Sequence, residues 1–228
     1  MIEMNFPEPT DFIDIHTHNG KTLDGVYFIE NLMAHEDTLP EDVPGKICSF
    51  GIHPWYLSNK NIDSLVKRVT DASGSSNLIA VGEAGFDKLR GPSKEIQNEA
   101  FNNQIYISEK IKKPVIIHCV RAWDDLISEH KKLKPKMPWL IHGFRGKTEL
   151  ARQLLSKGMY LSFWFDFALR SESSKLFRAL PKDKIFLETD GADVDIREIY
   201  KKVARDLDFS IDQLKSVIHA NFNEFFGL

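Results

Sequence analysis

The segment Asp14-Ile15-His16-Thr17-His18 holds two histidines separated by a single residue. If this segment ends a β-strand, His16 and His18 point to the same face, as does Asp14, because alternate side chains of a strand share a face. Two imidazoles side by side can ligate one divalent metal ion. The alternative is an exposed polar turn that holds two histidines by chance, and the pair alone does not decide between the two.

Histidines and acidic residues recur where apolar segments end. Beyond the first pair they are His53, Glu83, His118, His142, Glu188 and Asp190. For any one histidine, a hydrogen-bonded role at a strand end is the simpler explanation. For the whole set we favour metal binding, because a random scatter of 8 histidines would not place most of them at strand ends.

The residue types indicate which metal chemistry to expect. Histidines combined with carboxylates suit Zn²⁺, Mn²⁺ or Fe²⁺, and a carboxylate-rich site would also accept Mg²⁺. Glu83 could bridge two ions through its two oxygens, and paired ions activate a water and neutralise charge on a phosphoryl group. Asp190 could ligate a metal ion and accept the proton of that water. We therefore expect two divalent ions (Mg, Zn or Mn), with Glu83 and Asp190 as catalytic residues.

Short apolar segments alternate with charged segments of helical spacing. The candidate strands are Phe12–His16, Val26–Asn31, Ile47–Ile52, Leu78–Gly82, Val115–His118, Trp139–Ile141, Met159–Phe163 and Ile185–Glu188. This alternation predicts a parallel sheet, and eight strands in a chain of this length predict an α/β fold, a single-domain (β/α)8 TIM barrel over residues 1–228. In such a barrel the C-terminal strand ends meet on one face, so the polar residues that end the strands would share a pocket.

Helical periodicity is clear in three internal segments and near the C-terminus. Apolar residues recur at helical spacing around Leu65, Ile105 and Leu154, and residues 211–228 are typical of an amphipathic helix. These apolar faces are expected to pack on the core. The second strand is the least well defined of the eight, because residues 20–44 are irregular.

Composition limits the classes of protein to consider. The 228 residues carry a net charge of -3, which argues against a general coat of nucleic acid but permits a local grip on phosphate. The 2 cysteines form no Cys-x-x-Cys pair, which indicates a reducing compartment. We find no secretory signal and no segment apolar enough to span a membrane, so we expect a cytoplasmic protein. No feature demands an oligomer, and we expect a monomer.

Seven short motifs follow one another along the chain. They are Asp14–His18, Gly51–Pro54, Val81–Asp87, Pro114–His118 with Arg121, Ile141–Gly146, Tyr160–Phe163 and Leu187–Asp190. This ordered set resembles the TatD family of metal-dependent hydrolases, in the amidohydrolase-like barrel superfamily. The resemblance implies a divalent-metal hydrolase, in many members a deoxyribonuclease that acts on phosphodiester bonds.

The resemblance also implies a ligand set for each ion. The first ion would be held by His16, His18, Glu83 and Asp190. The second would be held by Glu83, His118 and His142, with Glu83 as the bridge. Glu188 precedes Asp190 by two residues and could orient a ligand histidine through a hydrogen bond.

Three further residues are candidates for contact with substrate. His53 lies in a Gly-x-His-Pro turn, where it could contact a substrate phosphate or order the loop. Arg121 and Arg145 follow two predicted ligands and could contact phosphate, or could form salt bridges on loops. Five aromatic residues also follow strand ends, and we expect one or two at most to stack on bases: Trp55, Tyr56, Trp123, Phe144 and Trp164.

The segment after the last acid is shorter than in the family, and the chain departs from the family pattern at three further places. These are Gly191-Ala192-Asp193, Trp164, and Ala122-Trp123-Asp124. None of these departures removes a predicted ligand. They therefore weaken the prediction of the substrate more than the prediction of hydrolysis. We favour a metal-dependent deoxyribonuclease with DNA or another phosphodiester as substrate. The alternative is a metal-dependent hydrolase of a small phosphoester, ester or amide. A non-catalytic scaffold is disfavoured, because every expected ligand type is present.

Overall fold

The computed structural model describes residues 6–43 and 45–228. Within them, eight strands alternate with helices, and the order of strands in the sheet follows the sequence. The strands are β1 (Phe12–Thr17), β2 (Val26–Met33), β3 (Cys48–Gly51), β4 (Leu78–Asp87), β5 (Val115–Val120), β6 (Trp139–Ile141), β7 (Tyr160–Trp164) and β8 (Ile185–Glu188). This is the predicted (β/α)8 TIM-barrel fold.

The α-helices follow the strands from β3 onward, and among the described residues none lies between β1 and β2 or between β2 and β3. They are α1 (Ile62–Ala72), α2 (Lys94–Ile111), α3 (Trp123–Leu133), α4 (Thr148–Leu155), α5 (Phe165–Ala168), α6 (Ser173–Ala179), α7 (Ile196–Leu207) and α8 (Ile211–Phe226), with short 3₁₀ turns η1 (Pro40–Asp42) and η2 (Pro54–Tyr56). The periodicity of the sequence predicted α1, α2, α4 and α8. Among the described residues, no helix has the length and apolar character needed to cross a membrane.

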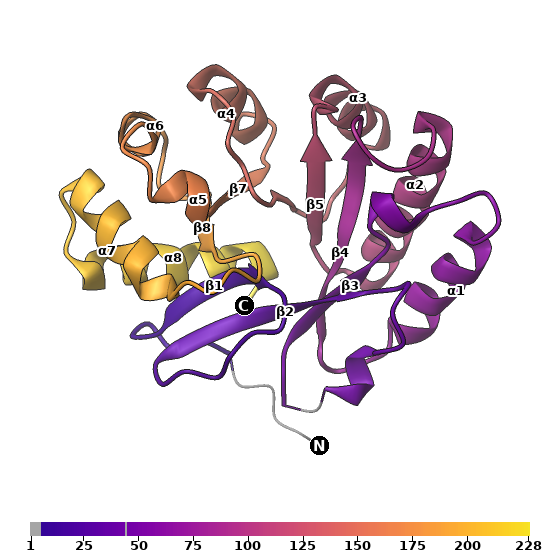
Figure 1. Ribbon diagram of the computed structural model, residues 1–228, viewed down its shortest axis with the longest axis horizontal. Helices are drawn as coiled ribbons and strands as arrows, with labels where there is room; N and C mark the ends of the chain where they lie inside the picture. The colour runs from indigo at the N-terminus through magenta and orange to yellow at the C-terminus, as the bar shows by residue number, and fades with distance from the viewer. Residues whose placement is uncertain (1–5, 44) are drawn as a thin grey trace. The chain divides into compact units, whose positions relative to one another are not determined.

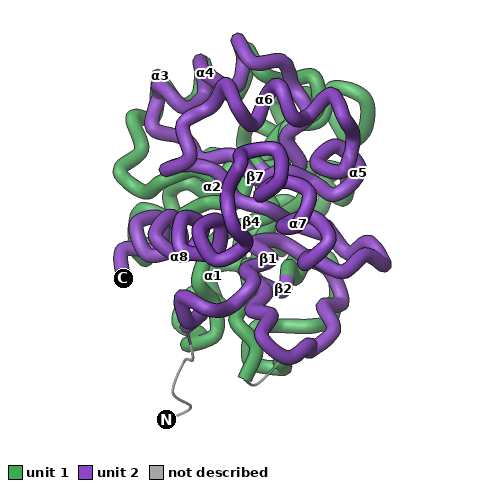
Figure 2. Tube along the Cα trace, turned by 90° about the vertical axis from the view of Figure 1, so that its left-hand side faces the viewer, with its two compact units in different colours: residues 1–4, 31–141 green, residues 5–30, 142–228 purple. Residues whose placement is uncertain are grey.

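Two compact units make up the described chain, coloured separately in Figure 2. The first unit holds residues 31–141. In it, α1 packs against α2, and α2 packs against β4 (Figure 1). The apolar face of α1 repeats at Ile62, Leu65 and Val69, and these side chains are buried in one cluster with Phe50.

The second unit holds residues 6–30 and 142–228. In it, α7 and α8 pack against β1 and β8 (Figure 1). α8 begins with a capping box, in which the Ser210 hydroxyl accepts from the Gln213 amide and the Gln213 side chain accepts from the Ser210 amide. It ends at Gly227, whose positive φ of 69° suits glycine.

Strand β4 is longer than the sequence indicated. It continues past Gly82 to Asp87, and its last residues pair in parallel with β5, Phe86 opposite Cys119 and Asp87 opposite Val120. Glu83 therefore lies inside β4, and the prediction that this strand ends at Glu83 was wrong. The extra residues carry an acid, Asp87, to the true C-terminal end of the strand.

Candidate metal-binding sites

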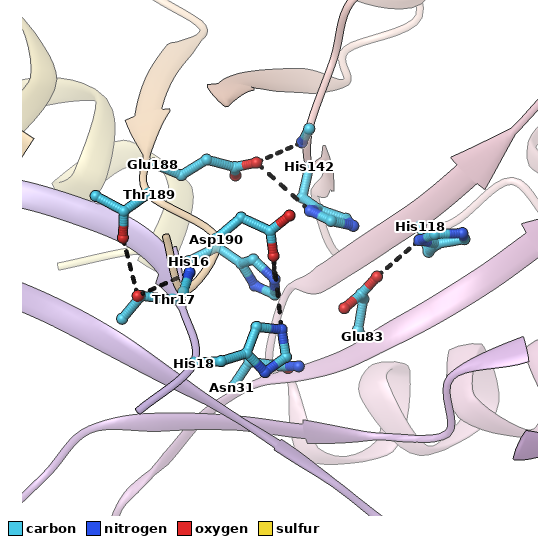
Figure 3. A network of polar contacts seen from close by, with 12 residues as sticks. His16, Thr17, His18, Asn31, Glu83, His118, His142, Glu188, Thr189 and Asp190 are labelled. Carbon is cyan, nitrogen blue, oxygen red and sulfur yellow. Dashed lines mark hydrogen bonds and ion pairs between the residues drawn. The ribbon is translucent and has the colours of Figure 1, made fainter. Parts of the chain in front are cut away.

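Three side chains of the first unit converge at the C-terminal side of β3, β4 and β5. Glu83 Oε1 lies 2.8 Å from Nδ1 of His118 and 3.1 Å from Nε2 of His53 (Figure 3 shows the first pair). The two imidazoles are 3.3 Å apart at these nitrogens. All three residues are buried and offer ligand atoms within 4.8 Å of one another, a spacing compatible with one shared cation.

A break in strand register sets the direction of Glu83. The pairing of β4 with β5 shifts between Val81 and Ala84. Gly82 takes a φ of 141° there, and a Cβ at this position would lie 2.4 Å from the carbonyl oxygen of Ile116. A local irregularity of this kind re-aims the side chain that follows it. Glycine is therefore needed at residue 82 for the neighbouring Glu83 to take this position.

Asp87 holds His118 from the opposite side of the imidazole ring. Its Oδ2 lies 3.2 Å from Nε2 of His118 and accepts a 2.6 Å hydrogen bond from the Trp55 indole. Its Oδ1 accepts from the amides of Leu89 and Arg90. Burial on its own raises the pKa of Asp87, but these hydrogen bonds outweigh it and hold the pKa below its usual range. The carboxylate thus stays charged and fixes which nitrogen of His118 faces Glu83.

His53 takes one of the two roles that the sequence left open, the ordering of its loop, and contact with a substrate phosphate stays a prediction. Its Nδ1 accepts from the Trp55 amide, which orders the turn η2. Its Nε2 lies at Glu83 and His118. His53 therefore orders its loop and also belongs to the cluster of potential metal ligands.

The second unit carries another cluster, at the C-terminal ends of β1 and β8. Asp190 Oδ1 lies 3.7 Å from Nε2 of His16 and 3.6 Å from Nε2 of His18 (Figure 3). The three residues offer ligand atoms within 4.8 Å of one another. His16 is fully buried, whereas the side chains of His18 and Asp190 are 26% and 27% exposed. Water can therefore reach the open side of this cluster.

The backbone holds Asp190 against β1. Asp190 has a φ of 52°, in the left-handed region that Asp tolerates better than most residues, and its amide donates to the carbonyl of His16 at 3.1 Å. A Cβ on Gly191 would lie 3.0 Å from that of His18, so the chain passes close to the histidine. These contacts aim the Asp190 carboxylate toward His16 and His18.

A network behind this cluster joins β1 to β8. Asp14 accepts from the amide and hydroxyl of Thr189, at 3.0 and 2.5 Å. The Thr189 hydroxyl also lies 2.9 Å from that of Thr17. Burial raises the pKa of Asp14 to about 7, partly offset by the Thr189 hydrogen bonds. Asp14 thus braces the two strands; the role of Thr189 was missed in the sequence because threonine has no distinctive signal.

Glu188 contacts a predicted ligand, as its position two residues before Asp190 suggested. It is fully buried, and its Oε1 lies 3.5 Å from Nδ1 of His142 and accepts from the Gly143 amide at 2.6 Å (Figure 3). Its Oε2 accepts from the Ser162 hydroxyl. A buried carboxylate in these contacts can orient the imidazole of His142.

Two of the predicted ligand assignments combine residues of different units. The sequence analysis grouped Glu83 with His16, His18 and Asp190, and grouped His142 with Glu83 and His118. Both groupings stay predictions. Within single units, the structure brings together His16, His18 and Asp190, and separately His53, Glu83 and His118.

The other predicted contacts have varied surroundings. Arg121 follows β5, is exposed and has a φ of 53°. The Arg145 guanidinium lies 4.8 Å from the centre of the Trp164 ring. Among the five aromatic residues that follow strand ends, Phe144 is buried, the Trp55 indole donates to Asp87, and Tyr56 stacks on His35. The expectation that one or two of these aromatic residues at most stack on bases stays a prediction.

A TIM-barrel fold with histidine and carboxylate clusters at strand ends is typical of metal-dependent hydrolases. The family model described as "TatD related DNase" matches residues 30–227. The chain belongs to this family.

Curated relatives carry matching names, and a solved structure shares the fold. The "Uncharacterized metal-dependent hydrolase YabD" of Bacillus subtilis is 30% identical over 126 residues, 54% of this chain and 49% of the relative. The "3'-5' ssDNA/RNA exonuclease TatD" of Cronobacter sakazakii is 30% identical over 146 residues, 62% of this chain and 55% of the relative. The chain thus spans about half the length of these curated relatives. The crystal structure of YjjV, a TatD homologue from Escherichia coli, shares the fold, with a TM-score of 0.80, 19% identity, and coverage of 97% of this chain and 100% of that one.

Proposed function

We propose that this chain is a divalent-metal-dependent hydrolase, and specifically a deoxyribonuclease that cleaves phosphodiester bonds. The observation that carries the proposal is the pair of buried or half-buried histidine–carboxylate clusters at strand ends, one in each unit. Clusters of this composition suit Zn²⁺ or Mn²⁺, and their carboxylates also accept Mg²⁺.

The donor set fits the metal ions that the family implies. His16, His18 and Asp190 would hold one ion, and Glu83 with His118 would hold a second. From the family resemblance we propose that His142 would also hold the second ion and that Glu83 would be shared by both ions. His53 is a further candidate beside Glu83. When bound, such ions supply an activated water and neutralise charge on the phosphoryl group.

The side chains of the chain have separable tasks. The amide of Asp190 donates to the carbonyl of His16, and the Asp190 carboxylate is partly open to solvent. A carboxylate oxygen of Asp190 can therefore accept the proton of an attacking water. Asp87 fixes His118 so that Nδ1 faces Glu83. Glu188 orients His142 through Oε1. These roles leave Asp190 as the proposed base, with Glu83 as the second catalytic carboxylate.

DNA is the substrate we favour, because the matched family is described as TatD related DNase and the Cronobacter relative is named an ssDNA/RNA exonuclease. Arg121 and Arg145 are proposed to contact substrate phosphate, Arg121 because it is exposed after β5. His53, beside Glu83, is proposed to contact the scissile phosphate or a metal ion.

The test is cleavage of single-stranded and blunt duplex DNA by purified protein, after EDTA treatment and after addition of Mg²⁺, Mn²⁺ or Zn²⁺. We expect no cleavage in EDTA and restored cleavage with at least one ion. A panel of phosphomonoesters, carboxylic esters and small amides runs in parallel. Turnover of a panel compound without cleavage of DNA would replace the nuclease proposal with the small-substrate hydrolase.

Three expectations from the sequence complete the proposal: one domain over residues 1–228, a monomer and a cytoplasmic location. Light scattering during size-exclusion chromatography tests the monomer. A single cooperative unfolding transition, seen at the same midpoint by tryptophan fluorescence and circular dichroism, would support one domain.

A further inference from the structure

A cavity of about 310 Å³ lies beyond the C-terminal end of β4, in the first unit. It is lined by residues 86–94 together with Gln97, Ala122 and Asp125. Three of the lining side chains are cationic: Lys88, Arg90 and Lys94. Because the whole chain has a net charge of -3, this group of cations runs against the overall balance.

Hydrogen bonds from Gln97 and Asp87 fix the backbone of the loop that carries the cations. The Gln97 side chain accepts from the Asp87 amide at 2.8 Å and donates to the carbonyls of Asp87 and Pro92 at 2.9 and 2.8 Å. Asp87 Oδ1 accepts from the amides of Leu89 and Arg90 at 2.7 and 3.0 Å. A loop fixed in this way presents its side chains with little ordering cost on binding.

Asp125 forms salt bridges with two of the three cations. Asp125 Oδ2 lies 2.8 Å from Nζ of Lys88, and Oδ1 lies 2.6 Å from Nζ of Lys94. The Asp125 side chain is only 12% exposed, whereas those of Lys88 and Lys94 are 49% and 59% exposed. Each ammonium has three donors and gives one to Asp125, so both keep donors for an anion on the solvent side.

Arg90 extends the cationic group toward the candidate metal site. Its guanidinium lies 4.0 Å from the centre of the Trp55 ring, and the Trp55 indole donates to Asp87. Asp87 in turn contacts His118, whose other nitrogen faces Glu83. The second acid in the lining, Asp87, has both of its oxygens engaged in hydrogen bonds. The cavity therefore begins one side chain away from the cluster of His53, Glu83 and His118.

We propose that Lys88, Arg90 and Lys94 form a subsite for a backbone phosphate of the nucleic-acid substrate, next to the phosphate that is cleaved. The proposal rests on the proposed nuclease function. Two ammonium groups and a guanidinium around one cavity suit the charge and oxygen atoms of a phosphodiester. The contacts would be made to phosphate, so DNA and RNA strands should bind there alike.

The test measures binding of an end-labelled oligodeoxythymidylate by fluorescence anisotropy, in EDTA so that no cleavage occurs, over a series of salt concentrations. Replacing Lys88 or Lys94 by Gln should weaken binding about two- to five-fold each. Each replacement should also lower the slope of log K against log salt by about 0.7, the value for one lost contact to a single strand. An oligouridylate should give the same losses.

Asp125→Asn should have the opposite effect and tighten binding, because it removes the anion that competes with the phosphate for the two lysines. The matched control is the exposed pair of Lys67 and Asp71 on α1, which is joined at 2.5 Å. Lys67→Gln and Asp71→Asn should leave both affinity and salt slope unchanged. Equal responses of the two pairs would show a general charge effect and overturn the subsite.

Unchanged affinity and slope in Lys88→Gln and Lys94→Gln would also overturn it, as would an intact chain that binds no oligonucleotide at low salt. The proposed function is tested separately, by metal-restored cleavage of DNA by the wild-type chain. Cleavage of DNA with no effect of the subsite substitutions on oligonucleotide binding would refute the subsite alone. Absence of cleavage with every ion would refute the nuclease.

Discussion

Replacement of Asp87 by Asn tests how the candidate site of the first unit is held. An ionised carboxylate only accepts hydrogen bonds, so His118 directs an Nε2 hydrogen toward Asp87 and keeps the Nδ1 lone pair for a metal ion. Asparagine has one acceptor and one donor group in the same shape. Whichever way it turns, its amide nitrogen faces either the Trp55 indole and His118 or the amides of Leu89 and Arg90.

The magnitudes follow from these contacts. Loss of a hydrogen bond that orients a ligand histidine costs roughly 10- to 100-fold in metal affinity. A donor left without an acceptor costs about 1–3 kcal/mol, and the half-buried Trp55 belongs at the lower end of that range. For a chain of this size, 1 kcal/mol corresponds to a fall in Tm of about 2–4 °C. We expect Asp87→Asn to stay folded, with a Tm lower by a few degrees and a much weaker metal affinity.

Metal affinity is measured by titration of the EDTA-treated protein with Zn²⁺ or Mn²⁺ in a calorimeter, beside thermal unfolding followed by circular dichroism. Asp71→Asn is the control, because it removes an exposed carboxylate paired with Lys67 in the same unit. A wild-type metal affinity in Asp87→Asn, with the expected fall in Tm, would refute the role assigned to Asp87 in orienting His118.

Three further substitutions have defined outcomes. Ser162→Ala removes the donor to Oε2 of the buried Glu188 and should destabilise the fold by about 1.5–3 kcal/mol in urea unfolding; a change below about 0.5 kcal/mol would show that this bond contributes little. Glu83→Ala should lower the bound metal measured by mass spectrometry, whereas the exposed Glu95→Ala should not. Arg121→Ala should raise KM for DNA by about two- to ten-fold with little change in Tm, and an unchanged KM would assign Arg121 to loop structure.

The sequence predicted the fold through alternation of apolar segments with helical stripes, and the predicted starting residues of all eight strands agree with the structure within one residue. The main error concerned β4. Its last residues, Ala84 to Asp87, are buried throughout and pair with β5, but glycines at positions 82 and 85 look like the end of a strand in the sequence. Glycine at position 82 instead marks an irregularity inside the strand.

The sequence indicated most potential ligands of the candidate sites and the contact of Glu188 with His142, but not the support of His118 by Asp87. His16, His18 and Asp190 lie close together because two strands far apart in sequence lie side by side. The positions of these residues at the ends of predicted strands were enough to indicate this. The contact of Asp87 with His118 could not be derived, because it depends on the register of β4 against β5. An acid four residues after Glu83 was the available signal, and it becomes meaningful only once the strand is known to continue.

Cleavage of DNA by the wild-type chain and by Asp190→Asn, each saturated with the ion that best restores activity, tests the central claim most directly. The account predicts that Asp190→Asn keeps its fold, measured by circular dichroism, and loses hydrolysis. The substitution removes the proposed base, which is also a proposed ligand of the ion that His16 and His18 would hold. Near-normal turnover by folded Asp190→Asn would contradict the proposed mechanism.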